Sequence, residues 1–277
     1  MRTSKPARLG LARTVALAVI IGIGLFNLYQ AAANWTLADA SAYWNAALRL
    51  RDGLPLYPLV TNVEASEVYR YAPWFAWVTV PFTFLPEQLM GALWSVILLI
   101  GSAVAMVPLV RARAWVLIAF FGPIMVGIGA SGNVHPLLVA ALVLGVERRT
   151  GPLWIALAAS LKIFPILFAA VYLGRREWTR AAVAVALTVA LWAPAVLYDL
   201  RGYTTDPGQA VSLFAIPAIW ALVVSAGVLL SIRLARTRFA WVTAATTVVL
   251  ALPRLFVYDI TYLMVGAVPA KRGIRPG

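Results

Sequence analysis

The chain has 277 residues, of which 62% are hydrophobic and only 12% are charged, with a formal net charge of +13. A soluble globular protein is roughly half apolar and about a quarter charged, so the composition excludes that class. It predicts an all-α polytopic membrane protein, because a membrane β-barrel would alternate polar and apolar residues along each strand.

Residue usage also narrows the chemistry. The chain has no cysteine, which excludes disulfides, Cys-ligated zinc and a thiol nucleophile, and its one histidine, His135, excludes a multi-histidine metal site. It contains no Walker A loop, HExxH motif or GxSxG motif, and no DxD pair occurs between residues 34 and 73. We therefore expect no cofactor and no metal. The basic residues are spread between apolar runs, so nucleic-acid binding is not expected.

Residues 1–13 contain four basic residues and precede an apolar run at 14–33 that is long enough to span a bilayer. The alternative is a cleaved signal peptide, for which Ala31, Ala32 and Ala33 would supply a small-residue cleavage site. The length of the run favours an uncleaved first helix.

The polar segment 34–73 follows, and it combines Tyr and Trp residues with four of the chain's ten acidic residues. Carboxylates and aromatic rings at a membrane face favour sugar chemistry over structural support. Within this segment we expect an amphipathic helix on the outer face over 37–51, ended by Asp52 and Gly53, because glycine just past a helix end is a usual stop signal. The four acidic residues are Asp39, Asp52, Glu64 and Glu67.

The next stretch, 74–85, is apolar but short, and it contains Pro81. We interpret it as an interfacial or re-entrant helix. A spanning helix here would place Arg111 and Arg113 outside, against the tendency of Lys and Arg to lie on the cytoplasmic side.

Basic breaks between the apolar runs assign the topology, because cytoplasmic loops carry an excess of Lys and Arg. These breaks hold 17 of the 23 Lys and Arg residues, and we place all of them inside. The active face is then the outer one, and both termini are cytoplasmic. About ten spans are predicted, at 14–33, 89–110, 114–130, 135–146, 152–161, 163–173, 181–198, 212–232, 239–256 and 259–270.

The stretch 152–173 could also form one ordinary span. Both of its flanks are basic, however, and Lys162 would then lie at its centre, where a charge is costly. Two short helices that meet at Lys162 satisfy both constraints. We see no internal repeat and no linker, so we expect a single integral membrane domain over 1–277 in the cell membrane.

Asp39 lies just beyond the first predicted span, where a carboxylate can meet both a lipid-borne donor and a watery acceptor. A carboxylate held there can act as a general base towards an attacking hydroxyl. The structural alternative is a helix N-cap or a partner of the helix dipole. Tyr43, four residues further on, shares the same helix face and is a candidate substrate-binding residue.

Lys162 is an ionisable residue within an apolar stretch. Such residues are costly in a membrane, so a functional role is the first hypothesis for Lys162. It could hold a phosphate as a point charge, or its ammonium could extend to the lipid head groups. Arg254 is a second cation predicted on the outer side, and Asp259 either belongs to the site or simply pairs with Arg254. His135 follows the turn at Asn133 and could hydrogen-bond a phosphate, or be an interface residue whose hydrogen bonds are satisfied.

Three further residues of the polar segment are candidates for substrate binding. Asp52 begins a turn that contains Tyr57, and Tyr71 precedes the return of the chain to the membrane. The tyrosine rings could stack on a sugar, or they could belong to the aromatic belt that membrane proteins place at the interface.

Taken together, these elements resemble glycosyltransferase family 87, also called the DUF2029 family. Its members are polyprenyl-phosphate-mannose-dependent mannosyltransferases of the GT-C class, best represented in actinobacteria. Each matching element is short, but they occur in order along most of the chain. They are Asp39, Tyr43, Asp52–Tyr57, Tyr71–Pro73, Gly132–Asn133, Ser160–Pro165 with Arg175–Arg176, and Tyr258–Asp259.

The resemblance implies a GT-C-like bundle of about ten transmembrane helices, with an outer-face loop that carries amphipathic helices. It implies transfer of a hexose, mannose, from a polyprenyl-phosphate donor to a glycolipid or glycan acceptor, with inversion, at the lipid bilayer. In such enzymes the aspartate after the first helix is the catalytic base, a role that falls here on Asp39. Basic residues facing the same cavity hold the phosphate, for which Lys162 and Arg254 are the candidates, followed by His135.

Two other classes are kept as alternatives. Family members are commonly longer at the C-terminus, so one alternative is an inactive truncated paralogue that serves as a scaffold. The other is a polytopic transporter or lipid flippase. A transporter should show paired repeats and ionisable residues near the midplane, whereas the ionisable residues here gather near one face.

Overall fold

The structure, a computed structural model, describes residues 37–62, 65, 68–204 and 211–270, together with scattered positions between 10 and 29. Half of the predicted first span, including its alternative cleavage site at 31–33, lies outside the described residues. The same holds for Glu64, Glu67 and the basic residues after 270.

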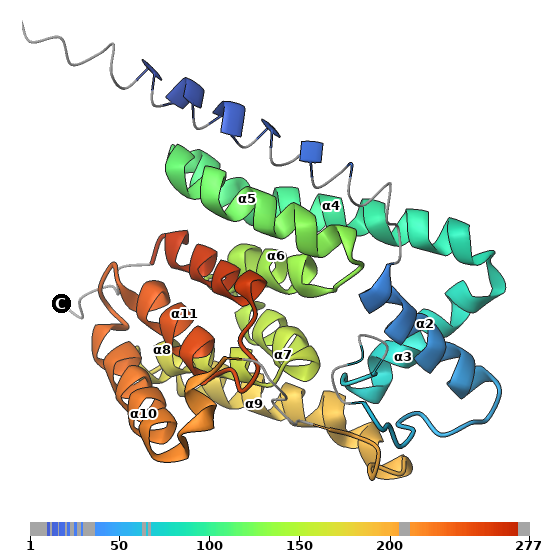
Figure 1. Ribbon diagram of the computed structural model, residues 1–277. Helices are drawn as coiled ribbons and strands as arrows, with labels where there is room; N and C mark the ends of the chain where they lie inside the picture. Colours follow the sequence, from blue (N-terminus) through green and yellow to red (C-terminus); the bar gives the residue numbers. More distant parts are fainter. Residues whose placement is uncertain are drawn as a thin grey trace, which may run out of the picture.

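All regular elements in the described part of the chain are helical (Figure 1), which confirms the all-α class. Their bounds agree within a few residues with those expected from hydropathy and charge. In chain order they are α2 (Ala38–Arg51), α3 (Pro73–Thr79), η1 (Val80–Phe84), α4 (Glu87–Arg111), α5 (Trp115–Ala130), α6 (His135–Gly145), α7 (Gly151–Leu161), η2 (Phe164–Phe168), α8 (Ala169–Gly174), α9 (Trp178–Trp192), η3 (Ala193–Leu197), η4 (Leu213–Ala215), α10 (Pro217–Leu234), α11 (Ala240–Ala251) and η5 (Val257–Ala267), where η marks a 3-10 helix.

Helix length divides the apolar helices into two groups. Among the described residues, three helices are long and apolar enough to cross a membrane, namely α4, α10 and the continuous helix Trp178–Leu197 formed by α9 and η3. The other apolar helices have 10–17 residues. An 11-residue helix such as α7 is about 16 Å long, which is roughly half of the hydrocarbon core. By length, most of the predicted spans therefore cross only part of the membrane.

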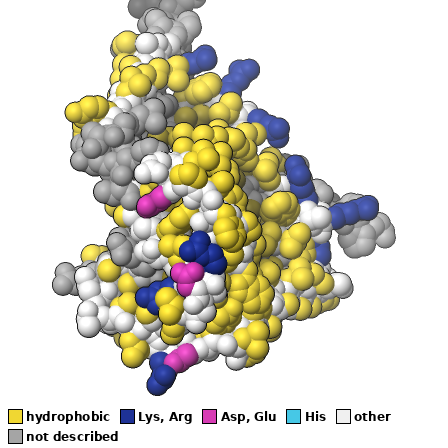
Figure 2. All heavy atoms as spheres, turned by 90° about the vertical axis from the view of Figure 1, so that its right-hand side faces the viewer, with side chains coloured by type: hydrophobic (Ala, Val, Ile, Leu, Met, Phe, Trp, Pro, Cys, Tyr) yellow, Lys and Arg dark blue, Asp and Glu magenta, His cyan; other side chains and the backbone are white. Residues whose placement is uncertain are grey.

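The short helices form the centre of the molecule. In Figure 1, α6 and α7 lie between a layer of α4 and α5 and a second layer of α8, α9 and α10, and α2 and α3 gather at one end. The buried core includes large side chains from α8, α11 and η5, among them Tyr172, Trp241 and Tyr262. Apolar side chains also remain exposed on the long helices, and Figure 2 shows a face on which hydrophobic side chains predominate and basic ones follow one margin. Such a surface suits lipid contact.

The structure confirms one prediction about a broken apolar stretch, and a second stays a prediction. Helix α7 ends at Leu161, and η2 begins at Phe164, so the chain turns at Lys162. The stretch 74–85 forms only the short pair α3 and η1, with Pro81 near the start of η1. Because this pair is too short to span the hydrocarbon core, it agrees with an interfacial or re-entrant helix.

Basic turns meet at the end of the bundle away from α2. Arg175, after α8, donates to the carbonyl of Ala235 after α10, at 2.8 Å. Arg180 donates to the carbonyl of Arg148, in the turn between α6 and α7, at 2.6 Å. Three of the basic breaks that were assigned to one side therefore lie together in space.

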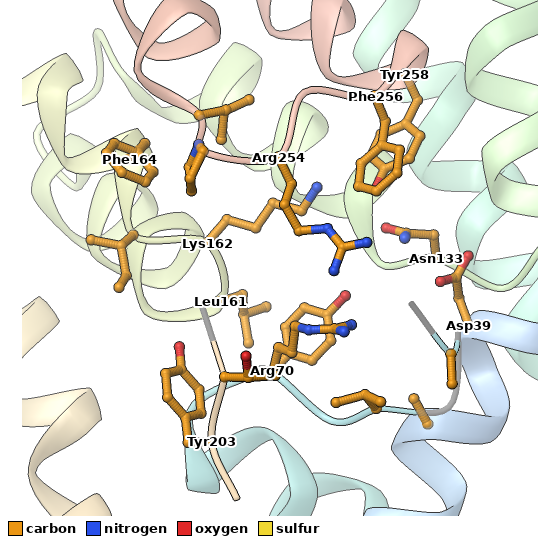
Figure 3. A pocket seen from close by; sticks show the side chains of 18 residues that line it. Asp39, Arg70, Asn133, Leu161, Lys162, Phe164, Tyr203, Arg254, Phe256 and Tyr258 are labelled. Atoms are coloured by element: carbon orange, nitrogen blue, oxygen red, sulfur yellow. The ribbon is translucent and has the colours of Figure 1, made fainter. Parts of the chain in front are cut away.

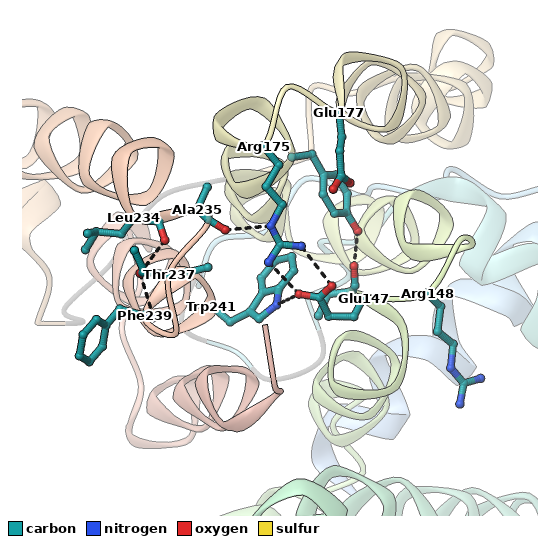
Figure 4. Close-up of polar contacts among 12 residues, drawn as sticks. Glu147, Arg148, Arg175, Glu177, Leu234, Ala235, Thr237, Phe239 and Trp241 are labelled. Atoms are coloured by element: carbon teal, nitrogen blue, oxygen red, sulfur yellow. Dashed lines mark hydrogen bonds and ion pairs between the residues drawn. The ribbon is translucent and has the colours of Figure 1, made fainter. Parts of the chain in front are cut away.

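A buried ion pair joins these turns (Figure 4). Arg175 donates to both carboxylate oxygens of Glu147, at 3.1 and 2.8 Å, and Trp241 Nε1 donates to the same carboxylate at 2.6 Å. The side chains of Arg175 and Glu147 are only 6% and 12% exposed. The guanidinium also lies 5.3 Å from the centre of the Trp241 ring, so one carboxylate links α6, α8 and α11.

Replacement of this carboxylate should destabilise the fold. We expect Glu147→Gln to lower the free energy of unfolding by about 3–5 kcal/mol, because it leaves the Arg175 charge buried without a counter-charge. Denaturant unfolding in detergent micelles measures the effect. The matched control is Asp199→Asn, which breaks an exposed pair with Arg201 and should leave stability unchanged. Equal stability of both variants and the native chain would contradict the account.

Candidate active site

A cavity of about 400 Å³ lies at the opposite end of the bundle from the basic turns. Figure 3 shows Lys162, Arg254 and Arg70 extending into it, with Asp39 across the space. Its lining comes from α2, the segment before α3, the turns that follow α5, α7 and α11, and the segment after η3. The lining residues are Asp39, Ala42, Ala65, Val68, Arg70, Tyr71, Asn133, Leu161, Lys162, Ile163, Phe164, Tyr203, Thr204, Leu252, Pro253, Arg254, Phe256 and Tyr258.

The cavity is recessed. Lys162 directly follows α7, whose other end is the basic turn before Gly151. Eleven residues of α-helix separate the two, which corresponds to about 16 Å. The polar cavity floor therefore lies roughly half a hydrocarbon thickness from the basic turns, and α2 and α3 cover it from the other side.

Asp39 is held by the turn that follows α5. Ser131 Oγ donates to Asp39 Oδ2 at 2.7 Å, and the Asp39 backbone N–H donates to the Ser131 carbonyl at 3.0 Å. The N-cap of α2 is Leu37, in a left-handed conformation with φ 39° and no side-chain capping bond. Asp39 is therefore not the helix cap, although it lies in the first helical turn, where the dipole favours a carboxylate.

Gly132 allows this close approach of α2 and the turn. Its φ is +84°, and a Cβ there would lie 2.6 Å from Ala40 Cβ and 2.9 Å from Ala40 N. Trp94 Nε1 fixes the same residue from α4 by donating to its carbonyl at 2.7 Å. Gly127, Gly129 and Gly132 match a dinucleotide-binding pattern by spacing alone, but they end a helix instead of following a strand.

Asn133 and Tyr43 position the start of α6. Asn133 Oδ1 accepts from the His135 backbone N–H at 2.9 Å, and Tyr43 Oη accepts from the Val134 N–H at 3.1 Å. Tyr43 in turn donates to Tyr71 Oη at 3.2 Å. Tyr43 is buried and does not line the cavity. The predicted substrate contact by Tyr43 is thus replaced by a supporting role.

Of these hydrogen-bonded tyrosines, Tyr71 is the one that lines the cavity. Because its oxygen accepts from Tyr43, its own O–H remains a donor for a ligand. Shielding from water raises the pKa of the Tyr71 phenol above its ordinary value, and the nearby Lys162 charge opposes this shift only in part. The group is therefore a neutral donor at physiological pH.

Two cations and two rings form a continuous stack along one wall. Lys162 Nζ lies 4.5 Å from the centre of the Tyr258 ring, which stacks on Phe256 at 5.3 Å with an interplanar angle of 10°. The Arg254 guanidinium lies 5.4 Å from the centre of the Phe256 ring. Cation–π contacts of this kind are worth about 0.5–2 kcal/mol. They place both cations at the cavity, as the sequence predicted for each.

Asp259 and His135 lie behind this wall and not in it. Asp259 is 1% exposed, and its ion pair is with Lys162, at 3.0 Å. The structure thus pairs Asp259 with Lys162, a partner that the sequence did not indicate, and Asp259 does not line the cavity as a predicted substrate-binding residue would. His135 is completely buried, and its Nε2 lies 2.7 Å from Thr261 Oγ1. The predicted contact between His135 and a substrate phosphate is therefore wrong, since the imidazole is buried and does not line the cavity.

Two other predicted site residues lie elsewhere. Asp52 follows the far end of α2, is exposed and pairs with its neighbour Arg51 at 3.0 Å. Thirteen residues of helix separate it from Asp39, or about 20 Å. Tyr57 is buried and donates to the Tyr71 carbonyl at 2.8 Å, so it shapes the backbone next to the cavity without lining it.

Arg70 lines the cavity, although it was not among the predicted site residues. The signal was present in the charge pattern. Six basic residues lie outside the basic breaks, and they are exceptions to the rule that places Lys and Arg inside. Three of the six line the cavity, namely Arg70, Lys162 and Arg254, and the others are Arg49, Arg51 and Arg201.

Apolar side chains make up the part of the lining around the α7–η2 turn. Leu161, Ile163 and Phe164 lie beside Lys162 in sequence, and Leu252 and Pro253 lie beside Arg254. Both cations thus have apolar neighbours on one side and the polar cavity on the other. Such a site suits a ligand with a charged head and a hydrophobic chain.

Residues 69–206, about half of the chain, match the family model of glycosyltransferase family 87. The matched part includes Arg70, Tyr71 and Lys162, and Asp39, Arg254 and Asp259 lie outside it. No curated protein and no solved structure matches the chain.

Replacement of Gly132 should disturb the placement of Asp39. We expect Gly132→Ala to lower the free energy of unfolding by about 2–5 kcal/mol. A left-handed alanine costs about 1–2 kcal/mol, and the overlap of the new methyl group with Ala40 adds about 1–3 kcal/mol. Gly53→Ala is the control, since Gly53 also has a positive φ of 69° but nothing within 4 Å of a Cβ. It should show only the cost of the left-handed conformation, about 1–2 kcal/mol. Identical losses of stability and of activity in the two variants would contradict the close approach.

Proposed function

The chain belongs to glycosyltransferase family 87, and we propose that it transfers mannose from a polyprenyl-phosphate donor to a hydroxyl of a glycolipid or glycan. The proposed reaction takes place at the outer face of the cell membrane and inverts the anomeric centre. The family identity supports glycosyl transfer over the transporter and scaffold alternatives. The choice of mannose rests on the family resemblance of the sequence motifs.

The observation that carries the proposal is the opposition of charges across one cavity. The carboxylate of Asp39 lies across from Lys162 and Arg254 (Figure 3). Glycosyl transfer from a lipid phosphate needs a base for the acceptor hydroxyl and cations for the leaving phosphate. The cavity supplies both types of group at its opposite sides.

Charge is conserved in the proposed reaction. As the glycosidic bond breaks, the phosphate gains a second negative charge while Asp39 takes up the proton of the acceptor hydroxyl. The net charge of the site is therefore the same before and after transfer.

The mechanism is a single displacement. Asp39 removes the proton from the acceptor hydroxyl, and the oxygen forms a bond to the anomeric carbon from the side opposite the phosphate. The bond between that carbon and the phosphate oxygen breaks, and its electron pair remains on the phosphate. Lys162 and Arg254 stabilise the developing charge in surroundings of low polarity, where such preorganised charges contribute most.

The apolar lining supports a direction for the donor. Ile163, Phe164 and Leu252 lie on the cation side of the cavity, next to the proposed phosphate position. The isoprenoid chain would contact these side chains, and the sugar would extend towards Asp39. Tyr71 and Asn133 also line the cavity and are proposed as hydrogen-bond partners of the sugar.

The test of the base is sugar transfer in membranes that contain the protein, with radiolabelled polyprenyl-phosphate-mannose and a glycolipid extract. We expect Asp39→Asn to lower the rate by about 10²- to 10⁴-fold, the contribution typical of a general base. Asp52→Asn is the matched control, because it removes a carboxylate from the far end of the same helix, and it should transfer at the native rate. Native activity in the Asp39 variant would remove this residue as the base.

The test of the phosphate site compares two outer cations. We expect Lys162→Met to raise the donor KM and to lower kcat by about 10²- to 10³-fold, as for loss of one charge-stabilising group. Arg201→Gln removes an exposed cation that pairs with Asp199 and does not line the cavity, so it should have no effect. If Lys162→Met behaved like Arg201→Gln, the phosphate assignment would be wrong.

A further inference from the structure

Asp259 has a different partner for each of its two carboxylate oxygens. Oδ1 accepts from Lys162 Nζ at 3.0 Å, and Oδ2 accepts from the backbone N–H of Phe256 at 2.9 Å. The Asp259 N–H donates back to the Phe256 carbonyl at 3.0 Å. One buried side chain thus fixes both the lysine after α7 and the segment that leads into η5, although these are 97 residues apart.

The same two contacts fix both ends of the cation–ring stack. Lys162 rests on Tyr258 at one end, and Arg254 rests on Phe256 at the other. Because Asp259 holds the lysine ammonium and the backbone of Phe256, it determines where both cations of this wall stand. Arg254 is two residues before Phe256, so its approach to the cavity depends on the same segment.

The neighbouring imidazole does not compete for this carboxylate. His135 Nε2 lies 2.7 Å from Thr261 Oγ1, which is its hydrogen-bond partner. Its Nδ1 lies 3.9 Å from Asp259 Oδ1, beyond hydrogen-bond distance, whereas Lys162 Nζ lies at 3.0 Å. Lys162 is consequently the charge partner of Asp259.

From these contacts we propose that Asp259 is a positioning residue that sets the phosphate subsite by fixing Lys162 and the Arg254 segment. The inference rests on the proposed function, in which these cations hold the donor phosphate. Asp259 itself is buried outside the cavity lining, so it acts through the cations and touches no substrate. It also supplies the counter-charge that a recessed ammonium needs when no phosphate is bound.

The test measures binding of polyprenyl monophosphate, a probe that carries the lipid and phosphate but no sugar. We expect Asp259→Asn to weaken binding by about 10- to 100-fold, as for other side chains that orient a ligand-binding group. In the Lys162→Met variant, Asp259→Asn should weaken probe binding by a smaller factor. Both substitutions disrupt the same ion pair, so their effects on affinity are not additive. Asp259→Glu, which keeps the charge, should recover part of the affinity.

Glu147→Gln is the matched control, because it also removes a buried carboxylate from an ion pair, at the other end of the bundle. It should lower stability without weakening probe binding by the folded protein. Thermal unfolding of each variant identifies the temperature range in which it is folded. If Asp259→Asn does not fold, the comparison of Asp259→Glu with the native chain decides, and unchanged affinity would overturn the proposal.

Three further results would overturn the proposal: native affinity in folded Asp259→Asn, an equal loss with and without Lys162, or an equal loss in Glu147→Gln. Failure of the proposed function has a different signature. In that case the native protein would bind the probe but transfer no sugar from labelled polyprenyl-phosphate-mannose.

Discussion

The buried ion pair between Lys162 and Asp259 is the interaction on which the cavity depends. A charged side chain in apolar surroundings is costly unless it is paired and hydrogen-bonded, and each oxygen of Asp259 has a partner. The pair joins the end of α7 to the start of η5. The pair thereby holds the aromatic stack and Arg254 along one wall of the cavity. The carboxylate of Asp39 lies at the opposite wall.

Short helices explain why such a pair can exist inside a membrane protein. Helices α6, α7 and α11 are each about half as long as the hydrocarbon core is thick. Their ends therefore bring polar turns to mid-depth, where other helices and the α2–α3 segment shield them from lipid. Irregular backbone at this depth is tolerated only where it is buried or lines a cavity. The fold thus creates a recessed polar chamber by shortening its helices.

The two polar ends of the bundle use charge differently. At the basic turns, Glu147 and Arg175 neutralise each other, and Trp241 completes the hydrogen bonds of the carboxylate. That arrangement holds helices together and leaves little charge for a ligand. At the cavity, by contrast, Arg70, Lys162 and Arg254 extend into a space large enough for a ligand, with Asp39 across it. This asymmetry distinguishes a structural cluster from a binding site.

Local sequence patterns were sufficient for the helices and for part of the site. The break at Lys162 followed from the cost of a central charge, and Asp39 followed from its place after an apolar run. The actual partner of Asp259 was not predicted, because Arg254 is near in sequence whereas Lys162 is near only in the folded chain. The burial of His135 and Tyr43 likewise depends on packing between distant helices. Arg70 was not predicted as a site residue, because it lies between two tyrosines of a kind common at the membrane interface. Its position outside the basic breaks could have indicated its role.

The most direct measurement is the structure of the Asp39→Asn variant with bound polyprenyl-phosphate-mannose, determined by electron cryomicroscopy. The account predicts a phosphate in contact with Lys162 and Arg254, an isoprenoid chain along Ile163 and Phe164, and an anomeric carbon turned towards position 39. A donor bound in another hollow, such as the apolar one between α4 and α5, would contradict it. So would the reverse orientation, with the phosphate beside position 39 and the sugar among the apolar side chains.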